Sequence, residues 1–122
     1  MRQAIAGAPL TIFGDGHQTR AFSYIDDVAG AIVRMALGPE HGFIVNVGGE
    51  EPIEILELAK RVLVATGSVG TIRHLDTRYE VTHAYCQHDV LRRVLGSWEP
   101  TPMSVGLPAM AALAKDLTIG PL

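Results

Sequence analysis

Glycine and proline residues divide this sequence into short apolar segments, some with the two-residue period of a strand and others with the 3.6-residue period of a helix. Leu10 to Phe13 and Ala21 to Ile25 have the length and pattern of short strands, with Phe22 and Tyr24 on one face of the second. Thr71 to Leu75 is a further short strand of this kind. The segment 43–47 is nearly all apolar, which predicts a strand buried on both faces.

Helical patterns fill the intervals between the predicted strands. Asp26 or Asp27 is expected to cap a helix that stops at Gly38-Pro39, because a carboxylate accepts from the free N–H groups of a first turn. Pro52 is expected to open the next helix, at a position where its missing N–H has no cost. Gly67 closes that helix.

Charged residues and prolines add detail to the predicted helices. Within the second helix, Glu57 and Arg61 are spaced to pair on the outer face. Asp89 to Leu95 is a short helix ended by Gly96, and a final helix covers about residues 104–117. Pro108 must lie in the first turn of that helix or break it. The resulting β-β-α-β-α-β-α-α order predicts a single α/β domain, a small mixed sheet with packed helices.

Length, charge and composition exclude several classes of function. A chain of 122 residues suits one domain, and a net charge of −3 provides no basic field for nucleic acid. We expect no membrane association, because no apolar run approaches the length of a membrane span, and residues 1–12 make a poor signal peptide. The single cysteine, Cys86, suits a reducing compartment, so the cytoplasm is the expected location.

The sequence IFGDGHQTRAF begins like a phosphate-binding glycine loop but departs from that motif. A dinucleotide fingerprint needs a third glycine where Thr19 stands, and it needs a helix after the loop. A strand is predicted here, so no helix N-terminus is available for a pyrophosphate. We interpret Gly14-Asp15-Gly16 as a structural turn. Arg20 is a better ligand candidate, because it lies beside a tight turn and its planar guanidinium fits a phosphate.

Three ordered motifs carry a resemblance to a known family. The sequences PLTIFGDGHQTRAFSYIDDVAGAI, FIVNVGGEEPIEILELAKRVLVATG and DTRYEVTHAYCQHDVLRRVLGSWEPTPMSVGL together cover about residues 8–108. They resemble the C-terminal, substrate-binding part of the extended short-chain dehydrogenase/reductase proteins, the NAD-dependent nucleotide-sugar epimerases and dehydratases of the UDP-glucose 4-epimerase type. The resemblance implies the substrate-binding lobe of that fold without its Rossmann half.

The resemblance also implies a set of substrate-binding residues for a UDP- or dTDP-sugar. The positions matching Thr11 and Phe13 offer backbone groups to the uracil or thymine ring. The arginines matching Arg20 and Arg78 reach the diphosphate, and the acidic residue matching Glu80 meets the ribose. Each role suits its residue type, since arginine forks fit phosphate oxygens and a carboxylate accepts from a hydroxyl.

The catalytic machinery of the family is not found in this sequence. Family catalysis uses a Tyr-x-x-x-Lys pair and a Gly-x-x-Gly-x-x-Gly loop that holds NAD. Four residues after Tyr24, Tyr79 and Tyr85 stand Val28, His83 and Asp89, never lysine. We therefore expect residues 1–122 to form a single nucleotide-sugar-binding domain that lacks an N-terminal dinucleotide-binding domain, has no catalytic residue and binds no NAD by itself.

Two functions remain open from the sequence. The chain is either the nucleotide-sugar-binding portion of an NAD-dependent epimerase or dehydratase, inactive alone, or a non-catalytic binding or interaction module that retains the fold. Its expected partners are the nucleotide sugar and either a separate N-terminal half or a second copy, because half a protein exposes the apolar face of the contact it lacks. No metal is expected, since His83, Cys86 and His88 fall short of the four ligands of a structural zinc site.

Overall fold

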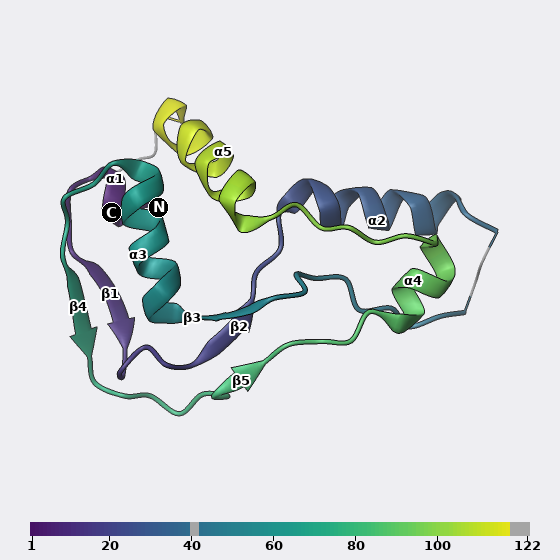
Figure 1. Cartoon of the computed structure of the whole chain (residues 1–122), viewed down its shortest axis with the longest axis horizontal. Helices are drawn as coiled ribbons and strands as arrows, with labels where there is room; N and C mark the ends of the chain where they lie inside the picture. The colour runs from purple at the N-terminus through teal and green to yellow at the C-terminus, as the bar shows by residue number, and fades with distance from the viewer. Residues whose placement is uncertain (40–41, 118–122) are drawn as a thin grey trace.

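The computed structural model describes residues 1–39 and 42–117 and shows two small sheets along an elongated molecule (Figure 1). The first sheet consists of β1 (Leu10–Phe13) and β4 (Ile72–Leu75), which run parallel with Leu10 opposite Ile72. The short helix α1 (Arg2–Ile5) and helix α3 (Ile55–Thr66) pack against this end of the molecule. Both strands lie where the apolar segments predict them.

The apolar core of the described residues lies between this sheet and its two helices. Leu10 and Ile12 project from one face of β1 and are buried against Ala4 of α1 and against Ala59 and Val62 of α3. The period of two in a strand places Thr11 and Phe13 on the opposite face. Helix α5 (Met103–Asp116) packs beside α3, where Leu107 contacts the same core. The core therefore covers one face of β1 and leaves Thr11 and Phe13 on the other.

The second sheet has the order β3-β2-β5 and occupies the middle of the molecule (Figure 1). Strand β2 (Thr19–Ala21) runs antiparallel to β3 (Pro52–Glu54) and parallel to β5 (His83–Ala84). The predicted strand of residues 21–25 is therefore shifted toward the N-terminus. Phe22 and Tyr24 lie beyond β2 in the segment that leads into the next helix.

Proline 52 does not begin a helix, and that prediction was wrong. Pro52 stands opposite Ala21 in the β-ladder, and α3 begins only at Ile55. A proline is tolerated there because β3 is an edge strand, whose N–H groups need not all be paired. The rest of the helix agrees with the sequence, since Gly67 ends it with φ +68°. Arg61 donates to Glu57 at 2.8 Å, which lowers the pKa of that carboxyl.

The far end of the molecule contains α2 (Ile25–Leu37) and the short helix α4 (Asp89–Leu95) (Figure 1). Helix α2 begins one residue before the aspartates, so neither caps it, contrary to our prediction. Both lie inside its first turn, and the carboxylate of Asp27 instead accepts from the N–H of Thr101 at 2.7 Å and from its hydroxyl at 2.8 Å. This contact ties α2 to the segment before α5.

Two further predictions were wrong. The segment 43–47 forms no strand, and Ile44 is 95% exposed, because no described strand lies beside it to accept its hydrogen bonds. Pro108 lies inside α5 beyond its first turn without ending it. None of the helices among the described residues has both the length and the apolar character that crossing a lipid bilayer requires.

Candidate nucleotide site

The open edge of β1 presents the backbone groups that the sequence analysis assigned to Thr11 and Phe13. The N–H of Leu10 donates to the carbonyl oxygen of Thr71, just before β4, at 2.8 Å, and the N–H of Gly14 donates to that of Leu75 in β4 at 3.0 Å. Because N–H groups alternate between the two edges of a strand, those of Thr11 and Phe13 point away from β4. The two residues thus share both a strand face and an exposed edge.

Two glutamine side chains contact these residues of β1. The side-chain amide of Gln3 donates to the hydroxyl of Thr11 at 3.1 Å, and the amide of Gln18 donates to the carbonyl oxygen of Phe13 at 3.0 Å. Gln18 was not among the residues that the sequence analysis selected. Its position two residues before Arg20, in the turn after β1, is the only signal that pointed to it.

A cavity of about 250 Å³ adjoins the end of β1. The turn at Gly14-Asp15, the side chains of His17 and Gln18, and the segment around residues 77–82 enclose it, so that Phe13, Arg78 and Glu80 all line the same space. Gly14 has φ +66°, a conformation that glycine adopts without strain. Asp15 closes the turn locally by accepting from the N–H of His17 at 3.0 Å.

Glu80 joins the two arginines that the sequence analysis selected. Its Oε2 accepts from Nη2 of Arg20 at 3.0 Å, and its Oε1 lies 3.6 Å from Nε of Arg78. The Arg20 and Glu80 side chains are 26% and 24% exposed, and that of Arg78 is 58% exposed. One carboxylate therefore neutralises part of the charge of a partly shielded arginine pair.

Each arginine also makes contacts beyond Glu80. Nη1 of Arg20 donates to the backbone carbonyl of Thr19 at 2.7 Å and to that of Thr82 at 3.3 Å. The guanidinium of Arg78 lies over the ring of Phe13, with Cζ 4.2 Å from the ring centroid. These contacts orient both guanidinium groups before any ligand is present, which lowers the entropy cost of binding.

The structure thus brings four of the five predicted substrate-binding residues together. Phe13, Arg78 and Glu80 line the cavity, and Arg20 reaches it through Glu80. Thr11 lies further back along β1 and is absent from the cavity wall. Its contribution to the site is the exposed strand edge that it shares with Phe13.

The glycine turn does not fit a dinucleotide cofactor. Strand β2 follows Gly14-Asp15-Gly16, so the turn leads into no helix whose N-terminus could hold a pyrophosphate. A Cβ on Gly16 would lie 2.8 Å from Cδ1 of Ile12 and 2.9 Å from Cβ of Leu56. This glycine is therefore required for close packing against the core, which is a structural role.

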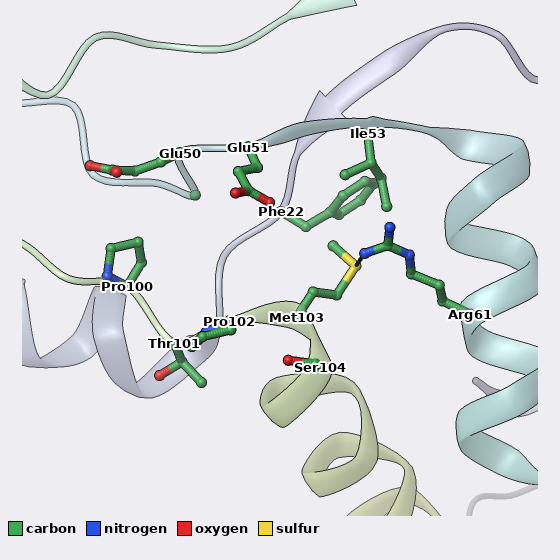
Figure 2. Close-up of a pocket in the computed structure, with 11 residues that line it drawn as sticks. Phe22, Glu50, Glu51, Ile53, Arg61, Pro100, Thr101, Pro102, Met103 and Ser104 are labelled. Atoms are coloured by element: carbon green, nitrogen blue, oxygen red, sulfur yellow. Dashed lines mark hydrogen bonds between the residues drawn. The ribbon is translucent and has the colours of Figure 1, made fainter.

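A second cavity of about 300 Å³ lies between the start of β3, α3 and α5 (Figure 2). Figure 2 shows Arg61 reaching from α3 toward Met103, with Phe22 and Ile53 nearby and Glu50 and Glu51 across the space. The guanidinium of Arg61 is paired with Glu57 outside the cavity. Two carboxylates and one paired arginine make an unfavourable environment for a diphosphate, so the Arg20–Arg78 site is the better anion site.

The histidines and the cysteine around β5 make two separate contacts. His83 lies 2.9 Å from the Thr19 hydroxyl through Nδ1, while Sγ of Cys86 lies 3.3 Å from Nε2 of the buried His88. Within the described part of the chain, no three His, Cys, Asp or Glu side chains are grouped as a metal ion would require.

Comparison with known proteins agrees with the family resemblance that the three sequence motifs indicate. Residues 1–48 match the family model of the NAD dependent epimerase/dehydratase family. UDP-glucuronic acid decarboxylase 2 of Arabidopsis thaliana is 32% identical over 97% of this chain, which spans 26% of that relative.

Solved structures show the same relationship. UDP-glucuronic acid 4-epimerase from Bacillus cereus, determined in complex with NAD, matches with a TM-score of 0.81 at 30% identity over 97% of this chain and 38% of the other. UDP-glucose 4-epimerase from Thermotoga maritima, determined with UDP-glucose, matches with a TM-score of 0.83 at 25% identity over 93% of this chain and 37% of the other. The chain thus spans well under half of the proteins that it matches.

Proposed function

Because this chain is related to the NAD-dependent nucleotide-sugar epimerases and dehydratases, we propose that it binds the nucleotide diphosphate of a UDP- or dTDP-sugar. In this proposal residues 1–122 form one substrate-binding domain. The dinucleotide-binding residues and the catalytic Tyr-x-x-x-Lys pair belong to polypeptide outside it. The reaction of the assembled enzyme is an epimerisation or a dehydration of the bound sugar, in the cytoplasm.

The convergence of Arg20 and Arg78 on one carboxylate beside the end of β1 supports this proposal above all. The two arginines come from distant parts of the sequence, yet both contact Glu80. A diphosphate offers oxygens to both forks at once, and arginine matches that geometry better than lysine. The edge of β1 that points away from β4 ends at Phe13, which Arg78 contacts, so this edge lies beside the arginines and offers its backbone N–H groups to a base.

Calorimetry with UDP tests the site directly. A hydrogen bond to a charged group contributes about 1.5–3 kcal/mol, so Arg20→Ala or Arg78→Ala should weaken UDP binding by about 10- to 100-fold. Arg20→Lys and Arg78→Lys should restore part of the affinity, since lysine keeps the charge and loses the fork. Arg92→Ala removes an arginine that is paired with Glu50 and does not line the cavity beside β1, so it is the matched control and should leave the affinity unchanged.

The outcomes separate a nucleotide site from surface charge. Equal UDP affinities in the wild type and all the arginine variants, or no binding at millimolar UDP, contradict the proposal. A loss that is confined to the Arg20 and Arg78 variants supports it. The purified chain should also fail to convert UDP-glucose or UDP-galactose when NAD is supplied, and turnover in the absence of host enzymes would contradict the assignment of catalysis to other polypeptide.

A further inference from the structure

We infer that residues 43–47 form the contact between two copies of this chain, by pairing as antiparallel strands across a two-fold axis. The segment lies at the end of the molecule that contains α2 and α4, opposite the sheet of β1 and β4 (Figure 1). The inference concerns a surface that the proposed nucleotide site does not use, so the two can be tested separately.

The segment has the side-chain pattern of a strand. The chain passes through neither a turn nor a bend between residues 43 and 49, and exposed residues alternate with partly buried ones from Ile44 to Val47. Such alternation is typical of a strand that has one covered face. On the covered side, Val45 lines a cavity of about 450 Å³ together with residues of α2 and α4. These two helices therefore already support one face of the segment.

The backbone of the segment has no partner. Among residues 1–39 and 42–117, none makes a backbone–backbone hydrogen bond with residues 43–47. Ile44 is 95% exposed and Phe43 is 51% exposed. The segment thus combines unpaired N–H and C=O groups with exposed apolar side chains, which is the combination that accepts an added strand.

The composition of the segment favours a second copy of itself as that strand. Residues 43–47 contain no charged residue and no proline, which are two of the features by which natural edge strands prevent self-pairing. Two copies therefore meet without like-charge repulsion, and segments of this composition pair readily with their own copies. A contact between identical surfaces closes as a dimer when a two-fold axis relates the two copies.

The residues that bound the segment set the register. Gly42 has φ +80°, a left-handed conformation that interrupts a strand, and Gly48 is buried, so five residues are available for pairing. Antiparallel pairing of five residues is complete when the two-fold axis passes beside the middle one, Val45. Phe43 then lies opposite Val47 of the second copy, and Val45 lies opposite its own equivalent. Residues directly opposite in this way have Cβ atoms about 4.5–5.5 Å apart.

Hydrogen exchange of the wild-type chain tests the pairing. The amides of residues 43–47 should exchange about tenfold more slowly at high micromolar than at low micromolar concentration, because paired amides exchange only when the dimer opens. Residues 76–79 are the control, since they also lie outside the helices and strands and their N–H groups donate to no described backbone carbonyl. Their exchange should not depend on concentration. Sedimentation at both concentrations measures the amount of dimer.

Disulfide trapping tests the register in a Cys86→Ser background, which removes the single cysteine of the chain. Val45→Cys should form a disulfide-linked dimer under mild oxidation, because the two sulfur atoms meet across the two-fold axis. Asn46→Cys lies opposite residue 44 in this register and should link more slowly. Val69→Cys, at a 99% exposed position between α3 and β4, is the matched control. It should link about tenfold more slowly than Val45→Cys, since no pairing brings its sulfur atoms together.

Each outcome decides the inference. Concentration-dependent protection of residues 43–47, together with preferential linking of the Val45→Cys variant, supports it. A wild-type chain that stays monomeric at high micromolar concentration overturns it, and so does a dimer in which these amides stay unprotected. Protection without preferential linking of Val45→Cys overturns the antiparallel two-fold pairing. None of these outcomes bears on UDP binding, because no residue of the segment lines the cavity beside β1.

Discussion

The guanidinium group of Arg78 lies over the aromatic ring of Phe13, with Cζ 4.2 Å from the ring centroid. This contact joins the end of β1 to the loop before β5, and both residues line the cavity beside β1. A cation over an aromatic face is attracted by the negative charge of the ring face. Phe13 therefore positions Arg78, in addition to the backbone groups that it presents.

Phe13→Leu should weaken UDP binding by removing this positioning contact. Exposed cation–π contacts are worth about 0.5–1 kcal/mol, which corresponds to about a twofold to fivefold loss of affinity. Phe13→Tyr keeps an aromatic face and should bind UDP as the wild type does. Calorimetry on the two variants measures the difference. An equal loss in both would contradict the role of the aromatic face.

Gly16→Ala should destabilise the domain more than a similar change at a roomy glycine. Gly16 has φ +84°, and its Cβ would lie within 3 Å of Ile12 and Leu56. Strain and overpacking together should lower the free energy of unfolding by about 2–4 kcal/mol. Gly7→Ala, at φ +68° with nothing near its Cβ, is the control and should cost about 1–2 kcal/mol. Urea unfolding of both variants tests this, and equal midpoints would argue against the packing role.

Asp27→Asn should loosen the connection between α2 and the segment before α5. The carboxylate accepts two hydrogen bonds from Thr101, at 2.7 and 2.8 Å, and an amide offers only one acceptor oxygen. The expected loss in unfolding free energy is about 1–2 kcal/mol. Asp26→Asn removes a charge from the same helical turn and leaves the Thr101 contacts intact. Thermal unfolding should therefore separate the two, and identical melting temperatures would contradict the role of Asp27.

The chain should self-associate or bind a partner through the apolar surface at the α2 end. Leu37 is 83% exposed and Ile44 is 95% exposed, and large apolar patches promote association. Ile44→Lys should shift sedimentation at high micromolar concentration toward the monomer. Val69→Lys, at a 99% exposed position between α3 and β4, is the control and should change nothing. A wild-type chain that sediments as a clean monomer would count against self-association.

Several elements of the fold are local properties of the sequence. Strand β1, the α3 end at Gly67 and the short helix α4 followed by Gly96 all lie where the sequence predicts them. Each depends on interactions within a few residues: an apolar segment bounded by turns, a left-handed glycine after a helix, or a helical period. Such features can be predicted without knowledge of the rest of the chain.

Strand pairing and hydrogen-bond partners are decided at longer range. Residues 43–47 are as apolar as a buried strand, but a strand requires a neighbour, and no described segment provides one. Pro52 is a residue typical of a helix start, yet β2 lies beside it, and the segment 52–54 pairs with β2 as a strand instead. Asp27 has the pattern of a cap, but Thr101 approaches it from a distant part of the chain.

The candidate site shows the same difference between what local sequence indicates and what long-range contacts decide. The sequence by itself selected Arg20, Arg78 and Glu80 as candidates, Arg20 from its residue type beside a turn and all three from the motifs that carry the family resemblance. Only the tertiary structure decided that one carboxylate joins both arginines, with Arg78 held over Phe13. The physical reason is that an ion pair depends on the distance between two groups, and β2 and the segment before β5 come together only when the chain folds.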